Sequence, residues 1–332
     1  MFHFLRRNGQ NGDQAMDAEA HAGAQTAPHR PSIGLVLGGG AARGFAHIGV
    51  LRTLIAKGLT PDIITGTSIG AVIGGCYAAG KLDDIETWGR GLTRRSLLGY
   101  LDVSFSGSGL LSGGKLAERI TESIGDVTID KLPLRYAAIA TEIGTGHEIW
   151  ITRGPLADAM RASYALPGIF PPIQLGERWL VDGALVNPVP VSVARALGAR
   201  LVIAVNVNTD LFGRGTAIPD QGAVAPEPPI EEEAASRGIF GIFGAEKSAK
   251  RRLFGTASRP GLSTVMVEAF NIMQDRITRA RLAGDPPDIL ISPRVGRIGL
   301  FDFHRAQDAI TLGAEAAERA LEGFDEVIAA LA

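Results

Sequence analysis

The sequence contains a single cysteine, Cys76, and therefore cannot form a disulfide bond within the chain. Cys76 lies in an apolar, helix-like run, so we expect it to be a core residue. The 332 residues also carry little excess charge, because 33 lysines and arginines stand against 35 aspartates and glutamates. A net charge of −2 gives no reason to expect nucleic acid as a partner, or a strongly basic surface over the whole molecule.

Long hydrophobic runs are scarce as well. Residues 63–80 carry no charge and are long enough to span a membrane, but they include five glycines together with Thr65, Thr67 and Ser68. A strand, a turn and a helix explain these glycines better than a helix in hydrocarbon. Residues 1–31 place arginines after a short apolar start and then turn polar, which is the wrong order for a secretory signal. We predict a disordered tail over residues 1–31 and a cytoplasmic protein, with peripheral contact at the inner membrane face as an open alternative.

Metal-ligand spacing and solenoid repeats are both missing from the sequence. Because no histidine, cysteine, aspartate and glutamate side chains group at ligand spacing, we predict a reaction that needs no metal, calcium included, and no cofactor. With 45% hydrophobic residues, the chain has enough apolar surface to bury the core of one large domain or two modest ones.

Two successive strand–loop–helix units are predicted near the start of the chain. Residues 32–37 (SIGLVL) form a continuous apolar run closed by glycines, which is typical of a buried parallel strand. The glycine-rich loop 38–44 follows, and then a helix with one apolar face that Gly58 ends. From residue 62 the same scheme repeats, with Ser68 in its turn. Two such units in succession predict parallel βαβ architecture.

The rest of the chain continues this alternation with one interruption. Further strands are predicted at 134–143, 147–152, 179–181, 201–207 and 289–292, and helices at 82–93, 115–124, 155–165, 189–197, 263–283 and from about 304 to 331. Residues 208–261 are rich in proline, glycine and alanine and mark a surface excursion, either a lid, a binding loop or disorder. Within it, residues 238–255 combine isoleucine and phenylalanine with lysine and arginine, which suits a segment lying on anionic lipid. A disordered basic loop, or a helix packed on the body, is the alternative.

The pentapeptide Gly66-Thr67-Ser68-Ile69-Gly70 has the G-x-S-x-G pattern, in which a serine lies on a sharp turn from strand to helix. The flanking glycines are needed because a Cβ would clash where the backbone doubles back. The hydroxyl then lies at a helix start, where free N–H groups favour negative charge. A serine is a weak nucleophile, so the pattern predicts catalysis only together with a base and with donors for an oxyanion.

The loop of residues 38–44, GGGAARG, offers candidate oxyanion donors, because its N–H groups are unobstructed and precede a helix. Such a loop could also hold a nucleotide phosphate. It lacks the Lys-Ser/Thr pair of a P-loop, however, and it fits G-x-G-x-x-G badly in either register.

Two partners for Ser68 are open. Asp182 ends a predicted strand and precedes Gly183, an arrangement that places a side chain at the carboxyl edge of a parallel sheet. His304 follows Asp182, and the order serine, aspartate, histidine would match an α/β-hydrolase triad. A turn aspartate and a solvated turn histidine are the alternative roles of these residues. The remaining histidines are His3, His21, His29, His47 and His147.

Four motifs in order carry a family resemblance: LVLGGGAARGFAHIGVL, GTSIGA, SYALPGIFPP and VDGALVNPVP, within residues 33–207. The chain resembles the patatin-like phospholipases, in the bacterial branch related to neuropathy target esterase. The resemblance implies an α/β fold, a three-layer sandwich with a mainly parallel central sheet and helices on both faces. It also implies one catalytic domain made of residues 32–207 and 262–332, and an acyl hydrolase that cleaves fatty-acyl esters of phospholipids or lysophospholipids through a Ser-Asp dyad.

Carried onto this sequence, the resemblance makes Ser68 the nucleophile and Asp182 the base. The oxyanion hole is then formed by Gly38, Gly39, Gly40, Ala41 and Arg43, and the supporting glycines are Gly66, Gly70 and Gly183. Ala41 stands where a third consecutive motif glycine usually lies, and alanine disfavours a positive φ, which leaves the loop conformation open. An aspartate with an ordinary pKa of about 3.9 is a poor base, so burial has to raise the pKa of Asp182.

Three classes of function therefore remain: the dyad acyl hydrolase, an esterase with a Ser68/Asp182/His304 triad, and a lipid-binding or regulatory protein without turnover on the same fold. The expected partners are a lipid ester and, transiently, a membrane surface, with no nucleic acid. The sequence leaves the oligomeric state open.

Overall fold

The computed structural model describes residues 30–96, 114–210, 255–256, 259–260 and 262–324. The predictions for residues 1–29, for most of the excursion 208–261, and for almost all of the lipid-facing segment 238–255 lie outside these residues. The strands are β1 (Ile33–Leu37), β2 (Ile63–Thr67), β3 (Arg135–Glu142), β4 (Glu148–Ile151), β5 (Ile173–Leu175), β6 (Arg178–Asp182), β7 (Leu201–Val205), β8 (Gly255–Thr256), β9 (Arg259–Pro260) and β10 (Ile289–Ile291).

One central sheet runs through the described residues in the order β10-β7-β1-β2-β3-β6-β5, and β4 also pairs with β3. The first five of these strands are parallel, whereas β4, β5 and β6 pair antiparallel with their neighbours. A mainly parallel sheet was expected and is confirmed. Every residue of β1, β2 and β7 is buried, which is why these strands read as unbroken apolar runs.

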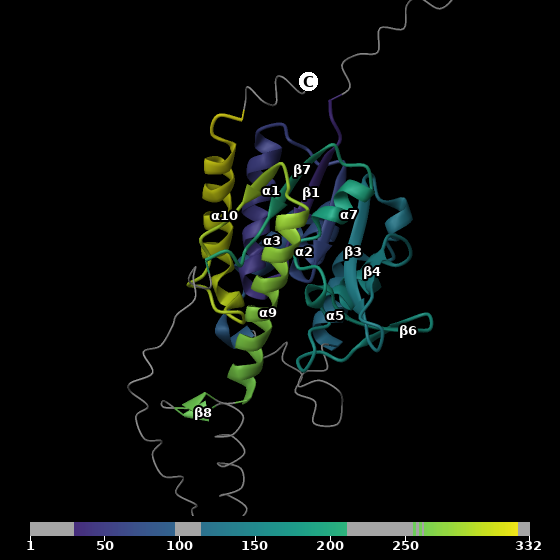
Figure 1. Cartoon of the computed structure of the whole chain (residues 1–332), viewed down its shortest axis with the longest axis vertical. Helices are drawn as coiled ribbons and strands as arrows, with labels where there is room; N and C mark the ends of the chain where they lie inside the picture. Colours follow the sequence, from purple (N-terminus) through teal and green to yellow (C-terminus); the bar gives the residue numbers. More distant parts are fainter. Residues whose placement is uncertain (1–29, 97–113, 211–254, 257–258, 261, 325–332) are drawn as a thin grey trace, which may run out of the picture.

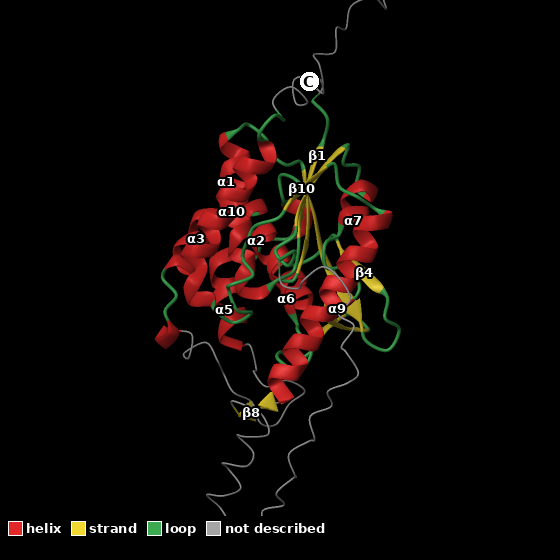
Figure 2. Ribbon diagram, turned by 60° about the vertical axis from the view of Figure 1, so that its left-hand side comes forward, coloured by secondary structure: helices red, strands yellow, loops and turns green. Residues whose placement is uncertain are grey.

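Helices cover both faces of the sheet (Figures 1 and 2). They are α1 (Ala46–Ala56), α2 (Ile69–Ala78), α3 (Leu82–Arg90), α5 (Gly114–Ile124), α6 (Leu156–Tyr164), α7 (Val191–Ala196), α9 (Leu262–Gly284) and α10 (Ala306–Leu321), with 3-10 turns η1 (Ala41–Phe45), η2 (Ile129–Lys131), η3 (Gly183–Leu185) and η4 (Phe303–Arg305). Figure 2 shows α1, α3 and α10 on one side of the sheet and α7 and α9 on the other. Alternate residues of β1 serve the two layers, because Leu35 and Leu37 join one core cluster and Val36 the other. The three-layer α/β sandwich is therefore the observed architecture.

Two details differ from the predictions. The last helix, expected to reach about residue 331, ends at Leu321, and Gly323 has a left-handed φ of 80° that stops it. The strand β5 was not expected, because it has three residues and none of them is buried. The remaining predicted strands and helices are confirmed to within a few residues at each end.

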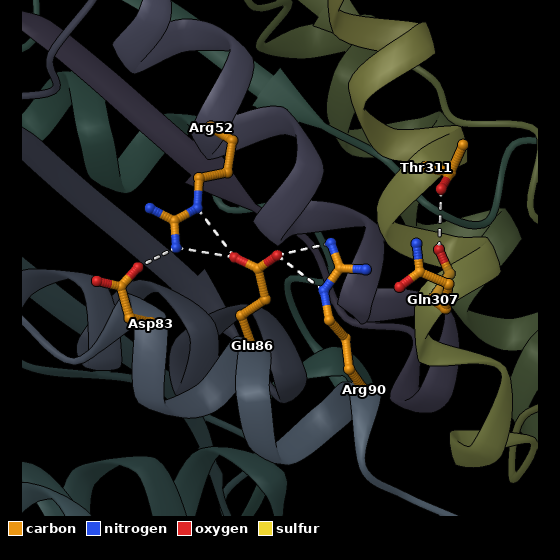
Figure 3. Close-up of polar contacts among 6 residues, drawn as sticks. All are labelled: Arg52, Asp83, Glu86, Arg90, Gln307 and Thr311. Atoms are coloured by element: carbon orange, nitrogen blue, oxygen red, sulfur yellow. Dashed lines mark hydrogen bonds and ion pairs between the residues drawn. The ribbon is translucent and has the colours of Figure 1, made fainter.

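A charged cluster fastens α3 to α1 (Figure 3). The carboxylate of Glu86 accepts hydrogen bonds from Arg52 of α1 at 2.8 and 2.9 Å and from Arg90 of α3 at 2.7 and 2.9 Å. Arg52 also binds Asp83. Because α3 carries Ile85 and Trp88, which line the cavity described below, this cluster helps to hold one wall of the site. The same view shows the hydroxyl of Thr311 bonded to the carbonyl of Gln307 within α10.

None of the helices in the described ranges is long and apolar enough to span a bilayer.

Candidate active site

Ser68 lies on the turn between β2 and α2. Its backbone has φ 56° and ψ −125°, an unusual conformation for a residue with a side chain. A Cβ on Gly66 would lie 2.5 Å from the nitrogen of Ala71, and one on Gly70 would lie 2.0 Å from the oxygen of Leu37. The predicted elbow is confirmed, and both glycines are required by close backbone contacts.

The strands β2 and β6 lie on the same side of β3. In a strand, backbone N–H groups of alternate residues point to the same side. The N–H of Arg135 donates to the carbonyl of Asp62, just before β2, and the N–H of Ile143 donates to the carbonyl of Trp179 in β6. The N–H of Glu142, one residue before Ile143, points to the opposite side and bonds to the turn that leads into β4. The strand β6 therefore pairs with the same edge of β3 as β2 does, beyond the point where β2 ends.

The ends of β2 and β6 meet head to head along that edge. Thr67 ends β2 opposite Ile139, and Asp182 ends β6 opposite the next residue of β3, Ala140. The Oγ atom of Ser68 consequently lies 2.6 Å from Oδ2 of Asp182, within hydrogen-bond distance. Asp182 ends a strand and lies at the carboxyl edge of the parallel sheet, as expected, but β6 itself runs antiparallel to β3 and reaches the serine from the opposite direction.

Asp182 is almost completely buried, with 1% of its surface exposed. Its Oδ1 accepts the N–H of Ala184 at 2.8 Å, at the start of η3. Burial raises the pKa of Asp182 to about 7, although the hydrogen bonds from Ser68 and Ala184 act in the opposite direction. The carboxylate is thus a much stronger base than a solvated aspartate. The following Gly183 has no room for a side chain, since a Cβ there would lie 2.2 Å from the oxygen of Ile139.

The glycine-rich loop has two parts with different roles. The N–H of Gly38 donates to the carbonyl of Val205 at 3.1 Å, and the N–H of Gly39 donates to that of Pro188 at 3.0 Å. In contrast to the prediction, these two groups hold the loop against β7 and against the segment before α7, and they are not free for an oxyanion. Gly40 and Ala41 line the cavity beside Ser68, and within the described part of the chain their N–H groups have no acceptor.

A third backbone donor belongs to Ile69, which directly follows the serine. Its N–H also has no acceptor among the described residues, and Ile69 lines the cavity. In G-x-S-x-G hydrolases the residue after the nucleophile commonly supplies one oxyanion donor. The pentapeptide itself holds this signal, whereas the prediction placed all of the donors in the glycine loop.

Ala41 adopts a left-handed φ of 46°, the conformation that the sequence left open for this position. Arg43, predicted as the basic member of the oxyanion hole, is buried and does not line the cavity. Its Nη1 donates to Oδ1 of Asn208 at 2.7 Å and its Nη2 to Oδ1 of Asn271 at 3.1 Å. Burial lowers the pKa of Arg43 to about 10, despite the nearby acidic side chains, so the guanidinium remains charged at neutral pH. Arg43 therefore supports the loop from behind.

No histidine of the described residues contacts Ser68 or Asp182. His304 accepts a hydrogen bond from Nε of Arg94 at 3.2 Å and does not line the cavity. The ring of His47 is bonded through Nε2 to the carbonyl of Gly38 at 2.8 Å, and burial lowers its pKa to about 4. The predicted triad through His304 is not formed. His147 is exposed on the β3–β4 hairpin, and the three histidines of the tail lie outside the described residues.

A cavity of about 150 Å³ begins at Ser68 and Asp182. Its other lining residues are Gly40, Ala41, Phe45, Ile69, Val72, Ile85, Trp88, Ile120, Tyr164, Leu166, Ile169, Phe170, Phe270, Gln274, Leu300, Phe301 and Phe303. The lining is almost wholly apolar and includes no lysine or arginine from the described residues.

Over the same residues, no group of three or more histidine, cysteine, aspartate and glutamate side chains could hold a metal ion.

Comparisons with known proteins show which family the chain is similar to. The family model of the patatin-like phospholipases matches residues 35–195, which include both Ser68 and Asp182. An uncharacterized NTE family protein of Mycobacterium tuberculosis is 34% identical over 333 residues, covering 89% of this chain and 92% of the relative. Patatin-like phospholipase domain-containing protein 7 of Mus musculus is 37% identical over 198 residues, 56% of this chain and 15% of that protein. Among solved structures, VipD from Legionella pneumophila matches with a TM-score of 0.48 and 13% identity, over 90% of this chain and 67% of that one.

Proposed function

The chain belongs to the patatin-like phospholipase family, and from this premise we propose that it is a serine acyl hydrolase acting on phospholipids or lysophospholipids. Family membership supports lipid ester hydrolysis in general, and the Ser-Asp dyad and the lipid class are our proposal. The observation that carries it is the direct 2.6 Å hydrogen bond between Ser68 and Asp182 at the end of an apolar cavity.

In the proposed reaction, Asp182 takes the proton of Ser68 as Oγ attacks the carbonyl carbon of the ester. The carbonyl oxygen becomes an oxyanion. The donors available to it are the N–H groups of Gly40, Ala41 and Ile69, which have no acceptor among the described residues. When the C–O bond to the alcohol breaks, the proton on Asp182 passes to the leaving oxygen. Water then attacks the acyl-enzyme with Asp182 again as the base, which releases the fatty acid and restores Ser68.

The apolar lining of the cavity suits a fatty-acyl chain. Each methylene group moved from water into such a lining contributes roughly 0.8 kcal/mol. Binding is therefore expected to strengthen with acyl length until the cavity is full. Because the described lining holds no cation, a charged headgroup is expected to remain outside it.

The helix α9 supports transient contact with a membrane surface. Its buried residues are polar (Asn271, Gln274, Asp275 and Thr278), whereas Val265, Met266, Ile272 and Met273 are between 45% and 49% exposed. A helix that faces water normally shows the opposite distribution. An exposed apolar stripe of this kind marks an interaction surface, and α9 also lines the cavity through Phe270 and Gln274. A bilayer that covers the stripe would deliver its lipids beside the cavity.

The test of the proposed function is covalent labelling of purified protein with a fluorophosphonate probe, followed by mass spectrometry. We expect the label on Ser68 and none on the Ser68→Ala variant. Full esterase activity of Ser68→Ala on short acyl esters would refute the assignment. A wild-type chain that takes no label would instead favour a lipid-binding protein without turnover.

The membrane contact is tested by flotation with anionic phospholipid vesicles. We expect Ile272→Ser/Met273→Ser to float less than wild type, since both exposed side chains lie on the apolar stripe. Ile55→Ser is the matched control, because Ile55 is also an exposed isoleucine but lies on α1, in the other helix layer. Equal flotation of all three proteins would remove the proposed membrane surface and leave the hydrolase proposal intact.

A further inference from the structure

Gln274 is a polar side chain of α9 that the mechanism above leaves unused. It is 2% exposed and lines the same cavity as Ser68 and Asp182. Its Nε2 lies 3.5 Å from the point that a Cβ on Gly39 would occupy, and the Cβ of Ser68 lies at the same distance from that point. The amide of Gln274 is therefore no more than about 7 Å from the Cβ of the proposed nucleophile.

A chain of hydrogen bonds fixes which end of this amide faces the cavity. The guanidinium of Arg43 can only donate, so Asn208 has to present its oxygen to it, at 2.7 Å. The Nδ2 of Asn208 then donates to the carbonyl of Gly39 at 2.9 Å and to Oε1 of Gln274 at 3.2 Å. Since Oε1 accepts from Asn208, Nε2 is the atom of Gln274 that is left to face the cavity. Because Arg43 can only donate, Asn208 is oriented with its Nδ2 toward Gln274. Gln274 accepts from Asn208 through Oε1 and is left with Nε2 as a donor.

The Nε2 group has no acceptor among the described residues, and it lies against an apolar lining. A donor that opens on this cavity is available to an oxygen atom of a bound molecule. An amide N–H is neutral and suits an uncharged oxygen, whereas phosphate is usually bound by arginine or lysine, which the described lining does not contain.

We propose that Nε2 of Gln274 donates a hydrogen bond to an oxygen of the bound ester, either the carbonyl oxygen or the alkoxy oxygen of the leaving alcohol. Asn208 and Arg43 are positioning residues that act through it. The inference rests on the proposed function, because it assumes that an ester is attacked by Ser68. It extends the recognition of the ester beyond the three backbone donors.

The test compares Gln274→Met and Gln274→Glu with wild type on an oxoester and on the thioester with the same acyl chain. Methionine keeps the volume and removes the amide, whereas glutamate keeps an acceptor for Asn208 and removes the donor. We expect kcat/KM on the oxoester to fall about 10- to 100-fold in both variants, with most of the loss in kcat and KM within about threefold. A loss that persists on the thioester assigns the bond to the carbonyl oxygen. A loss confined to the oxoester assigns it to the alkoxy oxygen.

Thr278→Val is the matched control. Thr278 is buried on the same helix, one turn further on, and it does not line the cavity. Its Oγ1 has no hydrogen-bond partner among the residues that the structure describes. Valine has nearly the same shape, so we expect kcat to stay within about twofold of wild type. An equal loss in Thr278→Val would attribute the effect to packing of α9 and overturn the inference.

Asn208→Asp tests the relay, because an aspartate still accepts from Arg43 but cannot donate to Gln274. We expect it to lower kcat with KM little changed, and to add less than about twofold to the loss in Gln274→Met. Retention of wild-type kcat/KM by both Gln274 variants, in a chain whose activity is lost in Ser68→Ala, would overturn this inference alone. Full activity of Ser68→Ala would overturn the proposed function together with it.

Discussion

Replacement of Asp182 by asparagine should stabilise the protein at alkaline pH while it removes the activity. Burial gives Asp182 a pKa of about 7 in the folded chain, whereas the unperturbed value is 3.8. Between these two values the folded chain holds a proton that the unfolded chain has lost. The free energy of unfolding therefore falls by about 1.4 kcal/mol for each unit of rising pH. The stabilising contribution is fully present below pH 3.8 and is lost once the pH has passed about 7.

Asparagine has nearly the shape of aspartate and does not ionise, so Asp182→Asn should lack this loss. Its side-chain oxygen can still accept the N–H of Ala184. Between pH 5 and pH 8.5, wild type should lose about 3 kcal/mol of unfolding free energy relative to the variant. Urea unfolding at the two pH values, followed by circular dichroism, measures this difference directly.

Ser68→Ala is the control for that experiment. It is also expected to be inactive, but it keeps the buried carboxylate and removes the hydrogen bond that lowers the pKa of Asp182. Its stability should therefore decline with pH at least as far as that of wild type. The reasoning is refuted if wild type and Asp182→Asn show the same pH dependence to within about 0.5 kcal/mol, a difference well below the linkage expected from the raised pKa.

Three further predictions follow from the same structure. Because Asp182 has to be ionised to act as a base, kcat/KM should rise about tenfold per pH unit below about pH 7 and level off above it, and a flat profile from pH 5 to 8 would exclude this base. Ala41→Gly should raise the unfolding free energy by about 1 kcal/mol, since alanine is strained at φ 46°, and a lower urea midpoint would contradict this. Glu86→Gln should lower the unfolding free energy by roughly 1 kcal/mol. Burial raises the pKa of Glu86, but the hydrogen bonds from Arg90 and Arg52 outweigh burial and lower that pKa overall. The difference in unfolding free energy between wild type and the variant should therefore shrink in acid, as the carboxylate protonates.

The parts of the fold that the sequence predicted are those set by local patterns. Strands buried on both faces appear as apolar runs, and the elbow at Ser68 has its own pentapeptide. The short strand β5 has no buried residue and left no such pattern. Asp182 could be singled out as a candidate base, but its direction of approach depends on pairing with β3, which no local pattern reveals.

The local sequence also does not determine which N–H groups of the glycine loop can act as donors. Whether an N–H of the glycine loop is free depends on the carbonyls of Val205 and Pro188, which are more than a hundred residues away. The direction of Arg43 depends on Asn208 and Asn271, on segments that close over the loop only in the folded chain. A glycine-rich sequence identifies such a loop, but tertiary hydrogen bonds decide which of its amides remain unused.

The head-to-head meeting of β2 and β6 makes enzymatic activity a reporter of folding order. Ser68 and Asp182 are 114 residues apart and share no helix or hairpin, so their hydrogen bond forms only after both strands have docked on β3. Contacts of such long sequence separation are slow to form, because chain entropy is lost before they are made. During refolding, helical circular dichroism should return before the capacity of Ser68 to take a fluorophosphonate label. The delay between the two signals would time the docking of β6 against β3.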